Sequence, residues 1–313
     1  MAYRFTRKAD VQDEARRIAR EQMDKALDEI EDSDLSLDET VHQVRKRCKK
    51  VRALLRLVRG ALEDDTYSAE NAWYRDTARQ LAPCRDAQVV LDTWRGLLSD
   101  LADEAKSEEL KPVEEELARR RAETAGNSEE TGKRLIEAGD RLRDGRKRVA
   151  TWTLAESAFD ALSGGLKKTY RRGRKGLSKA YADLTAESFH EWRKRAKYHW
   201  YHCRLLRDLW GEVIQVRAGE AHRLATILGD AHDLSVLRAT LSERPSDFGG
   251  YDVVEEALDL IDRRREDLRL SARPLGERLQ AEKPKALVKR LRVYDQAWRV
   301  TEREDDLLQL PDV

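Results

Sequence analysis

Several features that mark whole classes of protein are scarce in this sequence of 313 residues. Proline occurs 6 times and glycine 16 times, which is too little for a disordered or loop-dominated chain. No apolar run approaches the roughly 18 residues of a membrane-spanning helix, and no apolar segment follows the charged residues 1–8 as it would in a signal peptide. We therefore expect a soluble cytoplasmic protein without a membrane partner.

Cysteine and strand signals are also scarce. Cys48, Cys84 and Cys203 lie far apart in the chain, so they indicate small buried side chains in a reducing compartment rather than a disulfide framework or a metal site. Charged residues make up 39% of the chain and hydrophobic residues 40%, a balance that favours long amphipathic helices. The expected fold class is all-α.

Helical periodicity predicts twelve segments, with turns near residues 126–128, 245–250 and 284. Ser36 and Glu39 have the spacing of a capping box at the start of the second segment. The segments are 8–32, 38–63, 68–82, 86–106, 108–125, 129–148, 154–183, 187–210, 213–230, 233–243, 251–281 and 285–303.

The most informative feature is a basic helix that occurs twice. Residues 41–49 (VHQVRKRCK) return as residues 189–197 (FHEWRKRAK), an offset of 148. In each copy an apolar seam runs beside a polar stripe about 100° away on the helix. The seams are Val41, Val44, Cys48, Val51, Leu55, Val58 and Leu62, then Phe189, Trp192, Ala196, His199, Cys203, Leu206 and Trp210. The stripes are His42, Arg45, Lys49, Arg52, Arg56 and Arg59, then His190, Arg193, Lys197, Trp200, Arg204 and Arg207.

A second repeated element supports the duplication. Residues 81–90 align with residues 228–237, and in each copy an Asp, Asp86 or Asp233, follows a break and is expected to cap or brace a helix start. We predict two pseudo-symmetric four-helix bundles, an N-terminal one in residues 1–150 and a C-terminal one in residues 151–313, with a basic central cleft or pore.

The distribution of charge, rather than its total, indicates a partner. The 61 basic and 60 acidic residues nearly cancel, yet no acid lies between Glu39 and Glu63, and none between Ala161 and Ala182. A solvated helix face, the alternative explanation, normally carries acids that relieve repulsion between neighbouring turns. These faces carry none, which favours a bound polyanion.

The histidines divide into two groups. His42 and His190 open the two stripes and are expected to donate hydrogen bonds to phosphate oxygens. His199, His202 and His222 are expected to be structural. Trp200 replaces the arginine of the first copy (Arg52), so the two faces need not be equivalent.

Parts of the sequence pattern are compatible with three other functions. A nucleic-acid surface is a rival because it would use the same cations, but base recognition needs exposed aromatic or amide side chains, and Trp192 and Trp210 lie in the apolar seam. A metal-dependent phosphohydrolase of the HD type could use His202, His232-Asp233 and Asp259 or Asp262, although the counterpart of His232 is Arg85. The Glu-x-x-His spacing of Glu39 and Glu187 is that of di-iron bundles, but the adjacent cations would repel the metals.

These motifs together resemble the CHAD domain, the conserved-histidine α-helical domain, from about residue 8 to residue 303. The pairs His42-x-x-Arg45-Lys46-Arg47 and His190-x-x-Arg193-Lys194-Arg195, the elements Arg85-Asp86 and His232-Asp233, and the segment Lys168-Thr169-Tyr170-Arg171-Arg172-Gly173-Arg174 carry the resemblance. It implies two four-helix bundles around a basic pore that binds inorganic polyphosphate. No Glu-x-Glu-x-Lys motif of the hydrolase domain that often accompanies this family is found.

We therefore expect a stand-alone, non-enzymatic polyphosphate-binding protein without cofactor or metal, located in the cytoplasm at polyphosphate granules. The predicted binding residues are His42, Arg45, Lys46, Lys49, Arg52, Arg56, Lys168, Arg171, Arg172, Lys175, His190, Arg193, Lys194, Lys197, Arg204 and Arg207.

Overall fold

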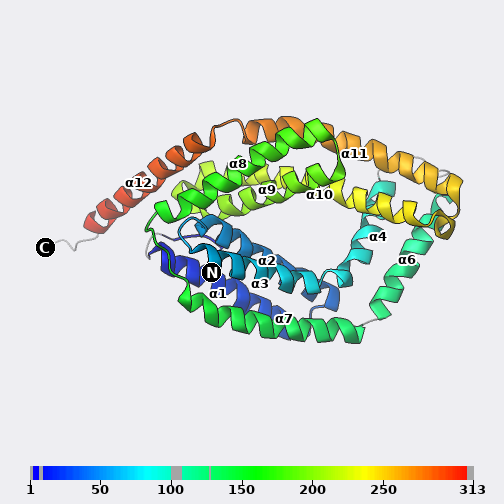
Figure 1. Ribbon diagram of the computed structural model, residues 1–313, viewed down its shortest axis with the longest axis horizontal. Coiled ribbons are helices and arrows are strands. Elements are labelled where there is room, and N and C mark those ends of the chain that lie inside the picture. The colour runs from blue at the N-terminus through cyan, green and yellow to red at the C-terminus, as the bar shows by residue number, and fades with distance from the viewer. Residues whose placement is uncertain (1–2, 7–9, 100–107, 127, 309–313) are drawn as a thin grey trace.

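The computed structural model describes residues 3–6, 10–99, 108–126 and 128–308, and all regular structure in these ranges is helical (Figure 1). This confirms the predicted all-α fold. The α-helices are α1 (Val11–Glu31), α2 (Leu37–Val58), α3 (Asp64–Gln80), α4 (Pro83–Ser99), α6 (Lys111–Gly126), α7 (Ser128–Arg148), α8 (Asp160–Asp183), α9 (Ala186–Leu205), α10 (Gly211–Glu243), α11 (Tyr251–Leu279) and α12 (Pro284–Leu308). Short 3₁₀ helices are η1 (Val149–Thr151), η2 (Arg207–Leu209) and η3 (Pro245–Phe248).

Four helices of the first half pack together: α1, α2, α3 and α7 (Figure 1). Their starts follow from local sequence. The Asp10 side chain accepts a hydrogen bond from the backbone N of Gln12 at 3.1 Å, and Ser36 and Glu39 form the predicted capping box at the start of α2. These bonds satisfy backbone N–H groups that have no partner within the helix.

The helices α8, α9, α10 and α11 form a second group, and α12 continues from it past α8 (Figure 1). The hairpin of α4 and α6 belongs by sequence to the first half, but it packs against α10 and α11. Trp94 and Val113 share a buried cluster there with Leu237 and Phe248. Two of the three hydrophobic clusters thus combine residues from both sides of residue 150, and the third lies within the second half. The division into 1–150 and 151–313 stays a prediction about the repeat.

The apolar seams are buried with one exception. Val41, Val44, Cys48, Val51, Leu55 and Val58 are at most 1% exposed, and the second seam is buried from Phe189 to Leu206. Trp210 was expected in this seam, but it is 50% exposed. The reason is that α9 ends at Leu205, so Trp210 lies outside the helix, in an extended conformation before α10. Cys48 and Cys203 are buried free thiols, as expected.

The predicted break between residues 230 and 233 is wrong, because α10 runs without interruption from Gly211 to Glu243. Gly229 sits inside this helix with the Arg193 guanidinium against it; a Cβ at Gly229 would lie 3.5 Å from Arg193 Nε. A glycine inside a helix costs about 1 kcal/mol of stability relative to alanine. Here the packing of Arg193 against Gly229 offsets that cost. Asp233 therefore does not start a helix, whereas Asp86 does lie in the first turn of α4.

The two halves meet where α8 crosses α2 at very short range. A Cβ on Gly165 would lie 2.0 Å from the carbonyl O of Leu57 and 2.3 Å from that of Arg56. Gly60 and Gly164 face each other in the same contact, where a Cβ on Gly60 would lie 3.3 Å from the Gly164 Cα. Only glycine at position 165 permits this backbone approach, and it brings the basic residues of α8 next to α2.

We predict that Gly165→Ala destabilises the protein by about 1–3 kcal/mol or more, because its methyl group can fit only if the two helices separate. Urea denaturation measures the change. Gly132→Ala in α7 is the matched control, since nothing lies within 4 Å of its Cβ position; it should leave stability level or raise it by up to about 1 kcal/mol. Equal effects of the two substitutions would contradict the close crossing.

Candidate anion-binding site

The stripe of α2 lies along the contact with α3. Asn71 on α3 accepts hydrogen bonds from Arg52 Nε at 3.3 Å and from Arg56 Nη1 at 2.6 Å, so one amide oxygen holds two guanidinium groups. Earlier in the stripe, Arg45 Nη1 donates to the carbonyl O of Ala78 at 2.9 Å. Arg52 and Arg56 are thus oriented by a neutral acceptor, and neither forms an ion pair in the described part of the chain.

Cations from three helices meet where α2, α8 and α9 pack. The Arg56 guanidinium lies 4.1 Å from the ring centroid of Tyr198 on α9, and burial, together with Arg52 and Arg195, lowers its pKa. Burial and the nearby Arg172 lower the pKa of Arg195. Arg59 is the main cause of the lowered pKa of Lys168. We call this set the junction cluster: Arg52, Arg56, Arg59, Lys168, Arg172 and Arg195.

The acids near the junction cluster are few: Glu191, and Asp64, whose charge partly opposes the lowering of the Lys168 pKa. Arg195 pairs with Glu191 at 2.9 Å, and the other five members form no ion pair within the described ranges. Elsewhere the abundant acids do pair with cations: Arg47, the neighbour of the stripe, binds Glu29, and Arg148 binds Glu70 at 2.7 Å. The uncompensated positive charge is therefore local, as the acid-free runs of sequence predict.

The stripe of α9 faces α10. The rings of His190 and His232 lie with their centroids 4.1 Å apart and their planes tilted by 37°, and Arg193 lies against Gly229 one turn away. Burial lowers the pKa of both histidines to about 4, with further contributions from Arg193 and Lys194. His190 Nδ1 and Arg193 Nε are buried without a hydrogen-bond partner among the described atoms. Arg193 Nε is a donor without an acceptor, which is what an anion site requires. His190 Nδ1 donates in the same way only in the tautomer that carries its proton there.

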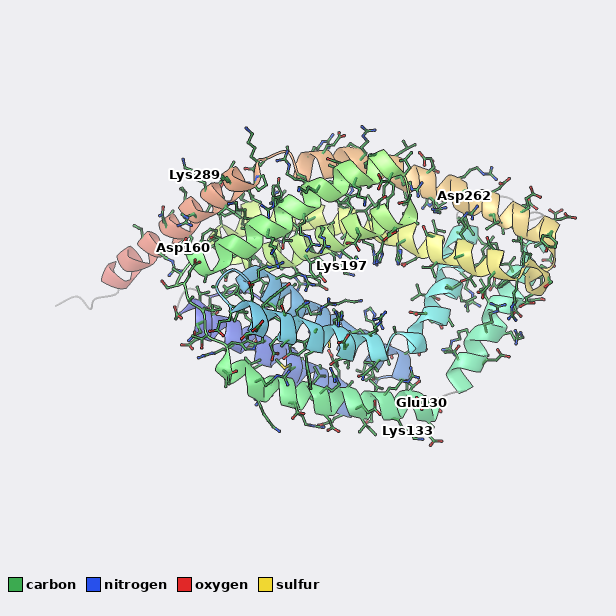
Figure 2. The ribbon with its side chains drawn as sticks, in the orientation of Figure 1. Glu130, Lys133, Asp160, Lys197, Asp262 and Lys289 are labelled. Carbon is green, nitrogen blue, oxygen red and sulfur yellow. The ribbon has the colours of Figure 1, made fainter. Side chains whose placement is uncertain are left out.

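The remaining predicted residues are dispersed. Lys46 Nζ donates to Gln43 Oε1 at 3.2 Å, and Lys194 pairs with Glu191. Lys197 lies near the middle of the molecule, whereas Lys133 and Lys289 lie on outer helices (Figure 2). His42, Lys49 and Lys197 are partly buried, and Arg171 and Lys175 are exposed on α8. Arg204 and Arg207 line a separate cavity with Trp200.

The candidate site also contains residues that the predicted set left out. Arg195 was part of the repeated motif, and Arg59 was part of the stripe, so both had a signal in the sequence. Asn71 and Tyr198 had none, because an amide and a tyrosine in an amphipathic helix are ordinary. Their roles depend on contacts between residues far apart in the chain.

The histidines of the apolar face are structural, as predicted. His202 is fully buried, and its Nε2 lies 3.1 Å from the carbonyl O of Ala53. His199 Nε2 accepts a hydrogen bond from Arg217 Nε at 3.1 Å. His222 differs: it is exposed and its ring lies 4.3 Å from that of Trp200.

The metal-site alternatives find no support in the described ranges, where no three His, Cys, Asp or Glu side chains are arranged to hold an ion. Asp262, a possible ligand in the phosphohydrolase hypothesis, accepts hydrogen bonds from Arg238 and Arg265. Glu39, the first residue of a di-iron spacing, is occupied in the capping box of α2.

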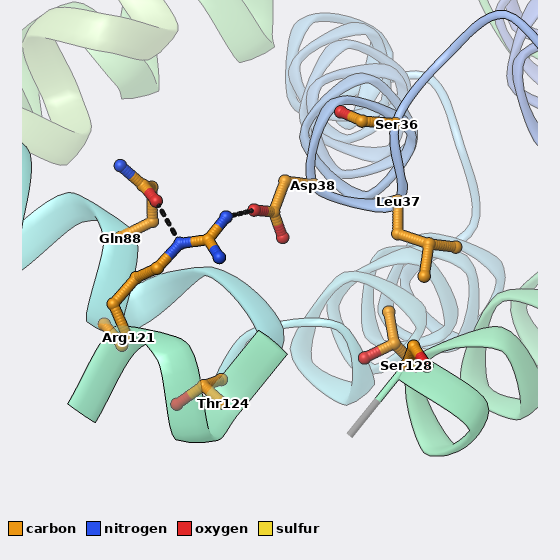
Figure 3. A pocket seen from close by; sticks show the side chains of 9 residues that line it. Ser36, Leu37, Asp38, Gln88, Arg121, Thr124 and Ser128 are labelled. Atoms are coloured by element: carbon orange, nitrogen blue, oxygen red, sulfur yellow. Dashed lines mark hydrogen bonds and ion pairs between the residues drawn. The ribbon is translucent and has the colours of Figure 1, made fainter. Parts of the chain in front are cut away.

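One further cavity, of about 230 Å³, lies between α2, α4, α6 and α7 (Figure 3). Its only cation among the lining residues, Arg121, donates to Gln88 Oε1 at 2.7 Å and to Asp38 Oδ2 at 3.0 Å. Because Asp38 already neutralises the charge of Arg121, this cavity is a gap in the packing between helices rather than an anion site.

Comparison with known proteins agrees with this description. The family model of the CHAD domain matches residues 17–242. The chain belongs to the CHAD domain family. The structure is similar to PptA from Streptomyces chartreusis, with a TM-score of 0.58, 15% identity, and coverage of 88% of this chain and 100% of that one.

The CHAD domain fold also matches that of the CHAD domain from the plant Ricinus communis, with a TM-score of 0.53, 17% identity and 95% coverage of each chain. A comparison with curated proteins gives no match. Within its described ranges, this CHAD domain has no helix long and apolar enough to cross a membrane.

The histidine pair predicts a pH dependence of stability. Because the native pKa values lie at about 4 and an unfolded histidine has a pKa of about 6.5, the unfolded chain binds more protons between these values. The free energy of unfolding should therefore fall as pH falls from about 6.5 to 4. In His232→Gln the fall measured by urea denaturation at pH 7 and pH 5 should be smaller. A variant as pH-sensitive as the wild type would show that the pair does not contribute.

Proposed function

We propose that this CHAD domain binds inorganic polyphosphate through the junction cluster and the basic face of α8, and that it catalyses no reaction. The observation that carries the proposal is the gathering of cations from α2, α8 and α9, of which only Arg195 forms an ion pair in the described part of the chain. In a chain with 61 basic and 60 acidic residues, such a region is not a consequence of composition.

The chemistry of the cluster suits an extended phosphate chain. Polyphosphate carries about one negative charge per phosphate at neutral pH, and guanidinium groups bind its oxygens by forked, charge-assisted hydrogen bonds. Arg56 and Arg195 are already partly desolvated, so a bound anion would relieve their mutual repulsion. Displaced counterions would add affinity, as they do for nucleic-acid backbones.

The predicted binding residues differ in how directly the geometry favours them. Arg52, Arg56, Lys168, Arg171 and Arg172 belong to the junction or lie on the adjoining face of α8. His190, Arg193 and Lys194 would extend the surface along α9. Arg204 and Arg207 line a separate cavity with Trp200. The other predicted residues, and a location in the cytoplasm at polyphosphate granules, are also part of the proposal.

The test is calorimetric titration with long-chain polyphosphate, pyrophosphate and single-stranded RNA. Long-chain polyphosphate should bind far more tightly than pyrophosphate, because only an extended polyanion contacts many cations at once. Its affinity should fall steeply between about 50 and 200 mM salt, since each neutralised charge contributes to the salt dependence. Tighter binding of RNA, or release of phosphate during the titration, would overturn the proposal.

Charge reversal tests the surface directly. Arg171→Glu with Arg172→Glu should lower polyphosphate affinity more than tenfold, because two charge-assisted contacts are lost and repulsion is added. Both side chains are exposed and form no ion pair in the described part of the chain, so the fold should be retained. The matched control is Lys285→Glu with Lys289→Glu on α12, which changes net charge equally. If the control lowers affinity as much, the binding is only a response to net charge.

A further inference from the structure

Lys50 is an unusual cation that lies outside both stripes. Its side chain on α2 is 5% exposed, and its ammonium lies 5.4 Å from the ring centroid of Tyr3. The ammonium itself forms no hydrogen bond or ion pair with any described residue. Burial of most of a lysine side chain without an acid beside its charge is costly.

The largest charge effects on Lys50 all come from cations. These are Arg47 and Lys46 on α2, Arg204 on α9 and Lys25 on α1, and of these Arg47 is itself paired with Glu29. Burial is the main cause, and these four cations the further causes, of a pKa lowered to about 7. The nearest aromatic group, Tyr3, donates its hydroxyl to the carbonyl O of Lys50 itself at 2.7 Å. None of the largest electrostatic effects on the ammonium comes from an acid.

A cavity of about 360 Å³ adjoins this place, and both Tyr3 and Arg204 line it. The Arg204 guanidinium lies 5.6 Å from the Tyr3 ring centroid and 5.3 Å from that of Trp200. Arg204 and the exposed Arg207 form no ion pair in the described structure, whereas Arg4 pairs with Asp208 at 3.1 Å. The cavity therefore combines two uncompensated guanidinium groups with a buried ammonium close behind them.

The counterpart of this cavity in the first repeat copy is built differently. The offset of 148 maps Arg56 onto Arg204, Tyr198 onto Lys50 and Arg52 onto Trp200. In the first copy Arg56 lies over Tyr198 and both arginines donate to Asn71. In the second copy Lys50 takes the position of the tyrosine, and Gly219 takes the position of Asn71. The cavity lies beside Gly219. The two places are thus chemically distinct.

We propose that Arg204 and Arg207 bind a terminal phosphate group in this cavity and that Lys50 supplies the buried positive charge that the phosphate neutralises. The inference rests on the proposed function for its ligand class and adds a subsite for the chain end. A terminal phosphate has three non-bridging oxygens and more charge than an internal one, so it suits a compact cavity with several donors. Lys50 acts through its charge, and we assign it no direct contact with the phosphate.

The test is titration of the full chain with tripolyphosphate at pH 8 in two buffers of different ionisation enthalpy. Since free Lys50 is largely neutral at that pH and a bound anion favours its charged form, the wild type should take up close to one proton more than Lys50→Met. Lys50→Met should also bind about tenfold more weakly. Its melting temperature should stay level or rise, because an uncompensated buried charge is removed.

Lys289→Met is the control, since this lysine is exposed on α12 (Figure 2); it should leave affinity and proton uptake as in the wild type. Equal proton uptake in the wild type and Lys50→Met, or a large loss of stability in Lys50→Met, would overturn the inference. A parallel titration with ATP identifies the source of the phosphate: equal Lys50-dependent affinity means that only phosphate is recognised, and tighter binding means that Trp200 or His222 also contacts the base.

Failure of the inference and of the proposed function are distinguishable. If Arg171→Glu with Arg172→Glu weakens long-chain polyphosphate binding while Lys50→Met changes neither ligand, the proposed function stands and the subsite is overturned. If tripolyphosphate binding depends on Lys50 but long-chain polyphosphate does not bind, the subsite stands and the extended surface fails.

Discussion

The close crossing of α8 over α2 is the contact on which the candidate site depends. Gly165 brings the two backbones so near that a single methyl group would meet the Leu57 carbonyl at 2.0 Å. Lys168 and Arg172 lie one and two turns further along α8, on the side that faces this contact. Lys168 therefore approaches Arg59, and Arg172 approaches Arg195, because the two backbones pack closely. These pairs carry like charges, so they do not attract each other.

Gathering these cations costs free energy, which the rest of the molecule must offset. The seam of α2, on the neighbouring face of the same helix, is almost completely buried. Apart from Arg195 with Glu191, the ion pairs lie away from the junction, such as Arg148 with Glu70 and Arg290 with Glu282, each at 2.7 Å. The protein thus separates matched charges, which are compatible with stability, from unmatched charges, which are compatible with binding a polyanion.

Local patterns in the sequence predicted most of the helices and the buried seams, because a helical period of 3.6 residues depends only on near neighbours. Predictions failed where packing outweighed a local signal. The repeated element suggested a break before Asp233, yet α10 continues through it. Trp210 continued the seam by spacing, but α9 ends at Leu205 and the tryptophan lies at the surface. The sequence pattern identified the basic stripes. It did not show that the stripe of α2 lies against α3 and the α8 crossing, or that the stripe of α9 faces α10.

The sequence by itself determined the all-helical class, the family, the buried faces of α2 and α9, and the acid-free basic segments. Only the tertiary structure decided which cations meet, because these contacts join residues more than a hundred positions apart: Arg56 with Tyr198, Lys168 with Arg59, Arg204 with Lys50. It also showed that Asn71 orients two arginines and that Lys50 is buried without an acid. Periodicity specifies a side chain's face on its own helix, but the charge it meets depends on how that helix crosses another.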